Sequence, residues 1–149
     1  MLFSTARVLK SDDQVQEILA NLTVVSMDEN PNAVAPEGKL FQRFKSKMFS
    51  LPQDQRETCL AFHGTQENNI ESICKKGYDP KLRRRQRFGK GEYFATTPDI
   101  SVEYCDGGKK LLLNELLLGQ NGTHHTQHQD IVVMKDPAHD LPRYIITFK

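Results

Sequence analysis

Two tyrosines and a serine in this chain stand at a spacing that could hold a flat aromatic ligand. They lie in the stretch GKGEYFATTPDISVEYC, which runs from Gly89 to Cys105. Residues 97–105 have the pattern of a short helix, on which Ser101 and Tyr104 share one face because residues three apart are neighbours. Tyr93 belongs to the strand expected just before that helix. The two rings could therefore sandwich a heteroaromatic ring, although the spacing alone favours the simpler alternative that both tyrosines are core residues.

A histidine at the end of another expected strand is the second candidate. The apolar run TCLAFH ends at His63 and is followed by Gly64. A lone histidine in such a place is more often a structural residue than a ligand-binding one. The glycine shifts this balance, because it lets a ligand approach the backbone, where an N–H and a C=O could pair with a carboxamide. We also expect little core packing for His63, so that its replacement by alanine should leave the fold intact.

The elements that must position these residues follow from hydrophobic periodicity and turn residues. Residues 28–38 read as a loop, and helices are expected over residues 11–22, 39–49, 68–77 and 97–105. Strands are expected over residues 22–27, 58–64, 91–96, 109–119, 130–134 and 143–148. The strands outnumber the helices and gather toward the C-terminus, which indicates an α+β domain with a largely antiparallel sheet.

The length and charge of the chain limit its class. Its 149 residues suit a single domain, with residues 1–50 as an N-terminal strand and helix region and residues 51–149 as the core that carries the motifs. The net charge of +1 offers no general attraction to nucleic acid or to a membrane. Three cysteines without a close pair, no signal peptide and no apolar stretch of membrane-spanning length indicate a cytoplasmic or nuclear protein.

Three stretches together resemble one enzyme family. LAFHGTQENNIESICKKGYDP, FGKGEYFATTPDISVEYC and LLLNELLLGQ are similar to the poly(ADP-ribose) polymerase family, the diphtheria-toxin-like ADP-ribosyltransferases. The family motifs occur in order, at residues 63–65, 89–95 and 101–105. The closing residues 130–149 and the helix at 39–48 resemble the mono-ADP-ribosylating members. The resemblance implies the ADP-ribosyltransferase fold, in which short helices flank a split, largely antiparallel sheet around an NAD cleft.

The resemblance also implies NAD as co-substrate, no metal, and a role for each motif residue. The implied NAD-binding residues are His63, Gly64, Thr65, Tyr93, Ala95, Ser101 and Tyr104. His63 would bind the adenosine-side ribose, and Gly64 would bind the nicotinamide carboxamide through its backbone with help from the Ser101 hydroxyl. Thr65 would help to place the ribose, while Tyr93 and Tyr104 would sandwich the nicotinamide ring.

Chain elongation in this family depends on a glutamate that binds a ribose hydroxyl. Alignment of the last strand places Ile145 at that position, and a shift of one residue would place Tyr144 or Ile146 there. None of these side chains is acidic. With His63 and Tyr93 as the other catalytic residues, the resemblance implies transfer of a single ADP-ribose to a protein acceptor, the chain itself included.

Three other functions stay open at this point. The chain could be a catalytically silent module that binds NAD or ADP-ribose, an NAD glycohydrolase with water as acceptor, or an enzyme that modifies nucleic acid ends. The near-neutral charge disfavours the last, although the basic segment KLRRRQR at residues 81–87 keeps it open. That segment could be a solvated loop, a nuclear import signal, or a contact for an acidic partner. The resemblance places it in the loop over the NAD site, where an arginine could meet the diphosphate.

The other polar side chains are expected to have lesser roles. Four histidines should lie in solvated polar loops rather than form a metal site, because no paired cysteine accompanies them: His124, His125, His128 and His139. Glu92 and Glu103 should face solvent. Glu115 is less easily assigned to the solvent-facing surface, because its neighbours in the stretch LLLNELLLG are apolar.

Overall fold

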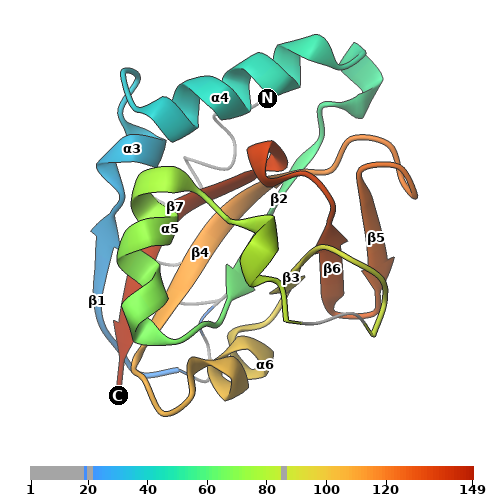
Figure 1. The fold of residues 1–149 in the computed structure, drawn as a ribbon. Helices are drawn as coiled ribbons and strands as arrows, with labels where there is room; N and C mark the ends of the chain where they lie inside the picture. Colours follow the sequence, from blue (N-terminus) through green and yellow to red (C-terminus); the bar gives the residue numbers. More distant parts are fainter. Residues whose placement is uncertain (1–18, 20–21, 85–86) are drawn as a thin grey trace.

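The sheet that dominates the fold is continuous and antiparallel. The computed structural model describes Leu19, residues 22–84 and residues 87–149, so most of the helix expected over residues 11–22 lies outside the described residues. Within them, seven strands follow the order β1-β7-β4-β2-β3-β6-β5, and every neighbouring pair is antiparallel (Figure 1). This arrangement confirms the expected α+β fold.

The elements are short, apart from one helix and two strands. The strands are β1 Val24–Glu29, β2 Thr58–His63, β3 Glu92–Ala95, β4 Lys110–Leu117, β5 His125–His128, β6 Ile131–Met134 and β7 Asp140–Phe148. The described α-helices are α3 Pro31–Val34, α4 Lys39–Ser50, α5 Ile70–Lys76 and α6 Pro98–Val102. The 3₁₀ helices are η1 Gln53–Gln55, η2 Glu67–Asn69, η3 Pro80–Leu82, η4 Glu103–Cys105 and η5 Pro137–His139. No described helix has both the length and the apolar character needed to cross a membrane.

Strand β5 was not expected from the sequence. Its residues, HTQH, lack the alternation of apolar and polar side chains that marks a half-buried strand. The strand forms because it pairs with the apolar strand β6 along its whole length, from His125↔Met134 to His128↔Ile131. Pairing with a neighbour, rather than local propensity, therefore determines this element.

A short helix, α3, interrupts the loop expected over residues 28–38. Asn30 caps it, since its side-chain oxygen accepts a hydrogen bond from the backbone N–H of Asn32 at 3.3 Å. Pro31 occupies the first helical position, where its missing N–H costs nothing. The cap is buried, because Asn30 Nδ2 donates to the carbonyl oxygens of Cys74 and Pro142. Asn30 thus ties the N-terminal region to α5 and to β7.

The sheet opens between β2 and β3. Strand β2 pairs with β4 along its whole length, from Thr58↔Leu117 to His63↔Leu112. It shares a single registered pair with β3, Phe62↔Ala95. Strands β1, β7, β4 and β2 therefore form one part of the sheet, and β3, β6 and β5 form the other (Figure 1). This opening corresponds to the split expected for the fold.

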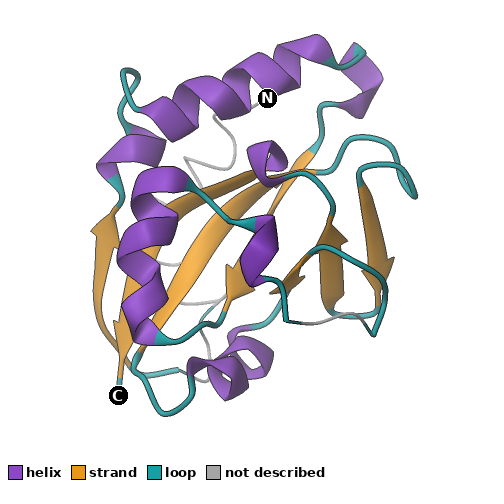
Figure 2. Ribbon diagram, viewed as in Figure 1, coloured by secondary structure: helices purple, strands orange, loops and turns teal. Residues whose placement is uncertain are grey.

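Helices cover the sheet and bury its apolar face. Ile70 and Ile73 of α5 pack in one core cluster with Leu112 of β4. Phe44 of α4 packs in another cluster, which includes Leu117 at the end of β4. Figure 2 shows α4 along one end of the sheet and α6 near the opposite end. The N-terminal helix α4 and the central strands thus share one core.

A buried ion pair joins β4 to β7. Arg143 Nη1 donates to Glu115 Oε1 over 3.1 Å, and the Glu115 side chain is 0% exposed. Burial raises the pKa of Glu115 to about 7, and the nearby Arg143 guanidinium opposes that shift only in part. The glutamate that stood out among apolar residues in the sequence is therefore a structural residue of the sheet.

The raised pKa of Glu115 predicts a specific dependence of stability on pH. The folded protein binds this proton more tightly than the unfolded chain, whose glutamate has the ordinary pKa of 4.5. The resulting stabilisation is complete below the unfolded pKa and is lost as pH rises through about 7. Between about pH 5 and pH 8 we expect the free energy of unfolding of the wild type to fall, relative to Glu115→Gln, by on the order of 2–3 kcal/mol in urea titrations.

The exposed Glu37 offers the matched control for this experiment. The curve for Glu37→Gln should follow that of the wild type across the same pH range. The unpaired Arg143 in Glu115→Gln shifts stability by a constant amount, because arginine stays charged throughout. Parallel curves for the wild type and Glu115→Gln would contradict the raised pKa.

Candidate active site

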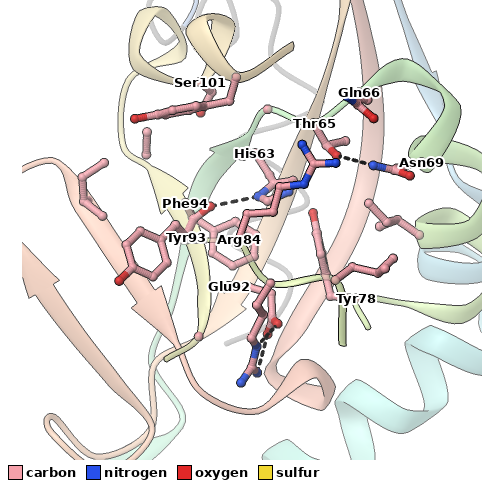
Figure 3. Close-up of a pocket in the computed structure, with 18 of the residues that line it drawn as sticks. His63, Thr65, Gln66, Asn69, Tyr78, Arg84, Glu92, Tyr93, Phe94 and Ser101 are labelled. Atoms are coloured by element: carbon pink, nitrogen blue, oxygen red, sulfur yellow. Dashed lines mark hydrogen bonds and ion pairs between the residues drawn. The ribbon is translucent and has the colours of Figure 1, made fainter. Parts of the chain in front are cut away.

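One cavity gathers the motif residues. Its volume is about 400 Å³, within the range of small-molecule sites, and residues of both β2 and β3 line it where the sheet opens (Figure 3). All seven residues expected to bind NAD line this cavity: His63, Gly64, Thr65, Tyr93, Ala95, Ser101 and Tyr104. They come from the end of β2, from β3 and from the consecutive helices α6 and η4. The fold therefore brings together three segments that are separate in the sequence.

His63 bridges the two parts of the sheet with its side chain. Its Nδ1 lies 2.8 Å from the backbone carbonyl oxygen of Tyr93. A carbonyl oxygen only accepts hydrogen bonds, so Nδ1 carries the hydrogen, and in the neutral ring Nε2 is then the acceptor nitrogen. The ring packs edge-on against Tyr78, with centroids 5.0 Å apart, and lies 5.4 Å from the ring of Phe94. The expectation that His63 has little packing is therefore wrong.

Gly64 lets the end of β2 approach α6 more closely than any residue with a side chain could. A Cβ at this position would overlap the backbone carbonyl oxygen of Ser101 and lie 3.2 Å from the Cβ of Tyr104. Ser101 is buried on α6 and Tyr104 follows on η4, because the helix expected over residues 97–105 becomes 3₁₀ after Val102. The close contact at Gly64 is what brings the serine and the second tyrosine to the cavity.

The two tyrosines line the cavity rather than the core. The Tyr93 hydroxyl accepts a hydrogen bond from the Phe88 backbone N–H at 2.7 Å and donates to the carbonyl oxygen of Gly89 at 2.6 Å. These two bonds close the Gly-Lys-Gly turn and hold the ring of Tyr93 in place. Tyr104 lies at the rim and is 38% exposed. The core-tyrosine alternative therefore fails for Tyr104 and does not account for the bonds of Tyr93.

Polar side chains near Thr65 also line the cavity, and the sequence did not single them out. Asn69 Nδ2 donates to Thr65 Oγ1 at 3.1 Å, and Gln66 Nε2 donates to Asp106 Oδ2 at 3.0 Å. The place of Asn69, four residues after Thr65 at the start of a helix, is the signal that could have indicated this contact. These bonds orient the threonine hydroxyl and join the η2 side of the cavity to the η4 side.

Comparison with known protein families agrees with this geometry. The family model of the poly(ADP-ribose) polymerase catalytic domain matches residues 31–143 of the chain. The chain belongs to this family. The match begins in α3 and reaches into β7, so it contains every described residue that lines the cavity. The reaction of PARP catalytic domains is ADP-ribosyl transfer with NAD as the substrate.

Ile145, the residue expected at the family's glutamate position, is outside the described lining of the cavity. Ile145 lies on β7 opposite Leu112 and packs on the core cluster of α5 and β4. Ile131 does line it, as the first residue of β6, opposite Ala95 of β3. Both strands read as short apolar runs in the sequence. Only the order of strands in the sheet shows which of them borders the cavity.

Glu92 is buried in this PARP domain, so the expectation that it faces solvent is wrong; Glu103 is exposed as expected. The Glu92 side chain is 5% exposed, and its two carboxylate oxygens accept hydrogen bonds from Nε and Nη2 of Arg83, the latter at 3.0 Å. Glu92 shares a face of β3 with the buried Phe94, because side chains alternate along a strand. That alternation is the signal that could have indicated its burial.

Asp140 lies against the ion pair of Glu92 and Arg83. Burial, followed by the charge of Glu92, raises the pKa of Asp140 well above its usual value. Neither of its carboxyl oxygens accepts a hydrogen bond from a described donor, and the Glu92 carboxylate is its polar neighbour. The raised pKa favours the protonated form of Asp140, which can donate one hydrogen bond to the neighbouring Glu92 carboxylate.

The basic segment of residues 81–87 borders the cavity. Arg83, Arg84 and Arg87 are among the residues that line it. Figure 3 shows the Arg84 side chain directed into the cavity. The Arg87 guanidinium lies 5.2 Å from the ring centroid of Phe88. Residues 85–86 lie outside the described residues, but the arginines on either side of them place positive charge at the site.

Three of the four histidines expected in polar loops lie elsewhere. His125 and His128 belong to β5, and the ring of His128 stacks on Phe88 with centroids 4.1 Å apart. His139 is buried in η5, where its Nδ1 donates to the carbonyl oxygen of Leu117 at 2.8 Å. Burial lowers the pKa of His139. Within the described part of the chain, no three His, Cys, Asp or Glu side chains gather as a metal site would require.

His63 and Tyr104 both line the cavity but differ in packing, which predicts different effects on stability. His63→Ala removes a ring packed on Tyr78 and Phe94 together with its hydrogen bond to the Tyr93 carbonyl, so we expect unfolding free energy to fall by about 1–3 kcal/mol. Tyr104→Ala removes a half-exposed ring and should cost less than about 1 kcal/mol. Urea unfolding of both variants measures the difference. Equal losses would contradict the packing described for His63.

Proposed function

We propose that this PARP domain transfers a single ADP-ribose from NAD to a protein acceptor and releases nicotinamide. The observation that carries the proposal is that His63, Gly64, Ser101, Tyr93 and Tyr104 line one cavity of about 400 Å³. These residue types can hold both sides of the glycosidic bond that must break. The aromatic and amide-binding groups suit the nicotinamide, and the imidazole suits a ribose hydroxyl.

The nicotinamide would bind between the two tyrosines. The ring of Tyr93 is already held by two hydrogen bonds of its hydroxyl, so little side-chain freedom is lost when a ligand stacks on it. Tyr104 offers the second ring at the rim. Each aromatic contact of this kind contributes about 0.5–1.5 kcal/mol beyond area burial. The carboxamide would pair with the backbone of Gly64 and with the hydroxyl of the buried Ser101.

His63 would position the ribose on the adenosine side. Its Nδ1 hydrogen is engaged with the Tyr93 carbonyl, so Nε2 is the nitrogen that can accept a hydrogen bond from a ribose hydroxyl. The acceptor's nucleophilic atom forms a bond to the anomeric carbon of the nicotinamide ribose as the bond to the nicotinamide nitrogen breaks. The electron pair of that bond returns to the ring, which leaves as neutral nicotinamide. Catalysis then comes mainly from holding the leaving group and the ribose in reactive geometry.

The lining of the cavity favours transfer of one unit over chain elongation. Ile131 is the first residue of β6, and its apolar side chain can neither orient nor deprotonate a ribose hydroxyl. The three carboxylates among the described lining residues already have partners. Glu92 pairs with Arg83, Asp106 accepts from Gln66, and Asp79 accepts from the backbone N–H of Lys81. A positioned general base typically raises the reaction rate by about 10²–10⁴-fold. A ribose hydroxyl is a weak nucleophile, so the lack of such a base slows chain elongation most.

The ring-binding slot can be tested with benzamide, which carries the ring and carboxamide without the rest of NAD. Tyr104→Ala should weaken benzamide binding by about tenfold in calorimetry, because the lost ring plane contributes on the order of 1 kcal/mol. Tyr104→Phe keeps the plane and should bind nearly as the wild type does. Ser101→Ala should cost about 1–3 kcal/mol, because the carboxamide loses a buried partner. If Tyr104→Ala binds benzamide as tightly as the wild type does, Tyr104 does not contribute to the ring-binding slot.

Incubation with NAD labelled in the adenosine part tests the reaction. We expect a discrete labelled protein band, equal amounts of nicotinamide and transferred ADP-ribose, and loss of both in His63→Gln. A high-mass smear digested by a chain-cleaving glycohydrolase would show polymer formation instead. Free ADP-ribose without labelled protein would identify a glycohydrolase. Tight NAD binding without any product would identify a silent binding module.

A further inference from the structure

The ion pair of Arg83 and Glu92 lies between the sheet and the cavity. Glu92 is on β3, and its carboxylate receives both Nε and Nη2 of the Arg83 guanidinium. Nη2 also donates to the backbone carbonyl oxygen of Lys135 at 3.0 Å, just beyond β6. The Arg83 side chain is 17% exposed and that of Glu92 is 5% exposed. A two-pronged pair with this degree of burial fixes the chain at residue 83 against the strands.

A second contact fixes the same segment beyond the arginines. The Phe88 backbone N–H donates to the Tyr93 hydroxyl at 2.7 Å, and the Phe88 ring stacks on His128 of β5 at 4.1 Å. Before Arg83, the Asp79 side chain caps η3 by accepting from the Lys81 N–H at 2.9 Å. Arg84 therefore follows directly on a residue anchored to the sheet, and its side chain is directed into the cavity (Figure 3).

We propose that Arg83 and Glu92 are positioning residues, and that their ion pair fixes Arg84 in the cavity to bind the diphosphate of NAD. This inference rests on the proposed function and adds to it a residue that recognises the phosphates and a pair that aims it. Arg84 shares the cavity with His63 and Thr65, the residues assigned to ribose. The diphosphate joins the two riboses of NAD, so a cation beside the ribose-binding residues is suitably placed for it.

The benefit of such an anchor is entropic and electrostatic. A long arginine side chain loses rotamer freedom when it binds a phosphate, and a fixed backbone reduces the number of conformations that must be excluded. Glu92 receives its two hydrogen bonds from Arg83, so the neighbouring Arg84 takes no part in this ion pair and its side chain lines the cavity, where an anionic ligand can meet it. Asp79 and Asp136, the other acids near this segment, accept hydrogen bonds from backbone N–H groups.

The experiment compares two fragments of NAD. ADP-ribose carries the diphosphate without nicotinamide, and benzamide represents the nicotinamide without phosphate. Calorimetry measures both ligands on the wild type, Glu92→Gln, Arg84→Ala and the double variant. Arg84→Ala should weaken ADP-ribose binding by about tenfold or more, because it removes a charge-assisted hydrogen bond. Glu92→Gln should weaken it about three- to tenfold, and benzamide binding should stay within about twofold in both.

The double variant distinguishes positioning from an independent effect. If Glu92 acts through Arg84, the double variant should bind ADP-ribose no worse than Arg84→Ala, because coupled residues are not additive. Glu103→Gln is the matched control, since Glu103 is an exposed acid near the cavity on η4. It should bind both ligands as the wild type does. If Glu92→Gln does not fold, Arg83→Gln makes the same comparison from the more exposed partner of the pair.

Three results would overturn this inference while leaving the proposed function standing. They are unchanged ADP-ribose binding in Glu92→Gln, equal weakening of both ligands, and additive losses in the double variant. The second would mean a general distortion of the cavity, and the third would mean that Glu92 does not act through Arg84. Failure of the wild type to bind either ligand would overturn the proposed function and this inference together.

Discussion

The hydrogen bond from His63 to the carbonyl oxygen of Tyr93 is the contact on which the rest of the site depends. Strands β2 and β3 share one registered pair, so backbone hydrogen bonds alone do little to hold the two parts of the sheet together there. Where the strands diverge, the hydrogen bond from the His63 imidazole joins β2 to β3 in place of backbone hydrogen bonds. The rings of Tyr78 and Phe94 pack against the imidazole. The sheet can therefore open and leave space for a ligand without losing its continuity.

The same bond determines what the histidine can do in that space. Because Nδ1 is committed as a donor, the tautomer of the neutral ring is settled and Nε2 is the acceptor nitrogen. The close contact of Gly64 with Ser101 then sets how near α6 and η4 come to this ring. His63, which joins the two parts of the sheet, and Gly64, which sets the distance to α6, are therefore adjacent residues that also shape the cavity. This arrangement also explains why a small domain can present a preorganised site.

Two buried ion pairs limit which charged side chains can interact with a ligand. Glu115 and Arg143 pair within the sheet, away from the described residues that line the cavity. Glu92 and Arg83 form a second pair beside the cavity, where burial raises the pKa of the neighbouring Asp140. The positive charge that the described lining residues offer to an anionic ligand is then that of Arg84 and Arg87. The described lining of the cavity therefore combines arginines with aromatic rings, and the Arg87 guanidinium lies over the ring of Phe88.

The sequence by itself determined the features that depend on local spacing. The motif at residues 63–65, the tyrosines on β3 and η4, and the six strands with apolar runs follow from neighbours within a few positions, and the structure has them. Strand β5, the burial of Glu92 and the place of Ile145 depended on partners far along the chain. HTQH becomes a strand because β6 lies beside it, and Glu92 is buried because Arg83 folds onto it. Ile131 rather than Ile145 borders the cavity because β6, and not β7, is the neighbour of β3 in the sheet, an order that residue types alone do not encode locally.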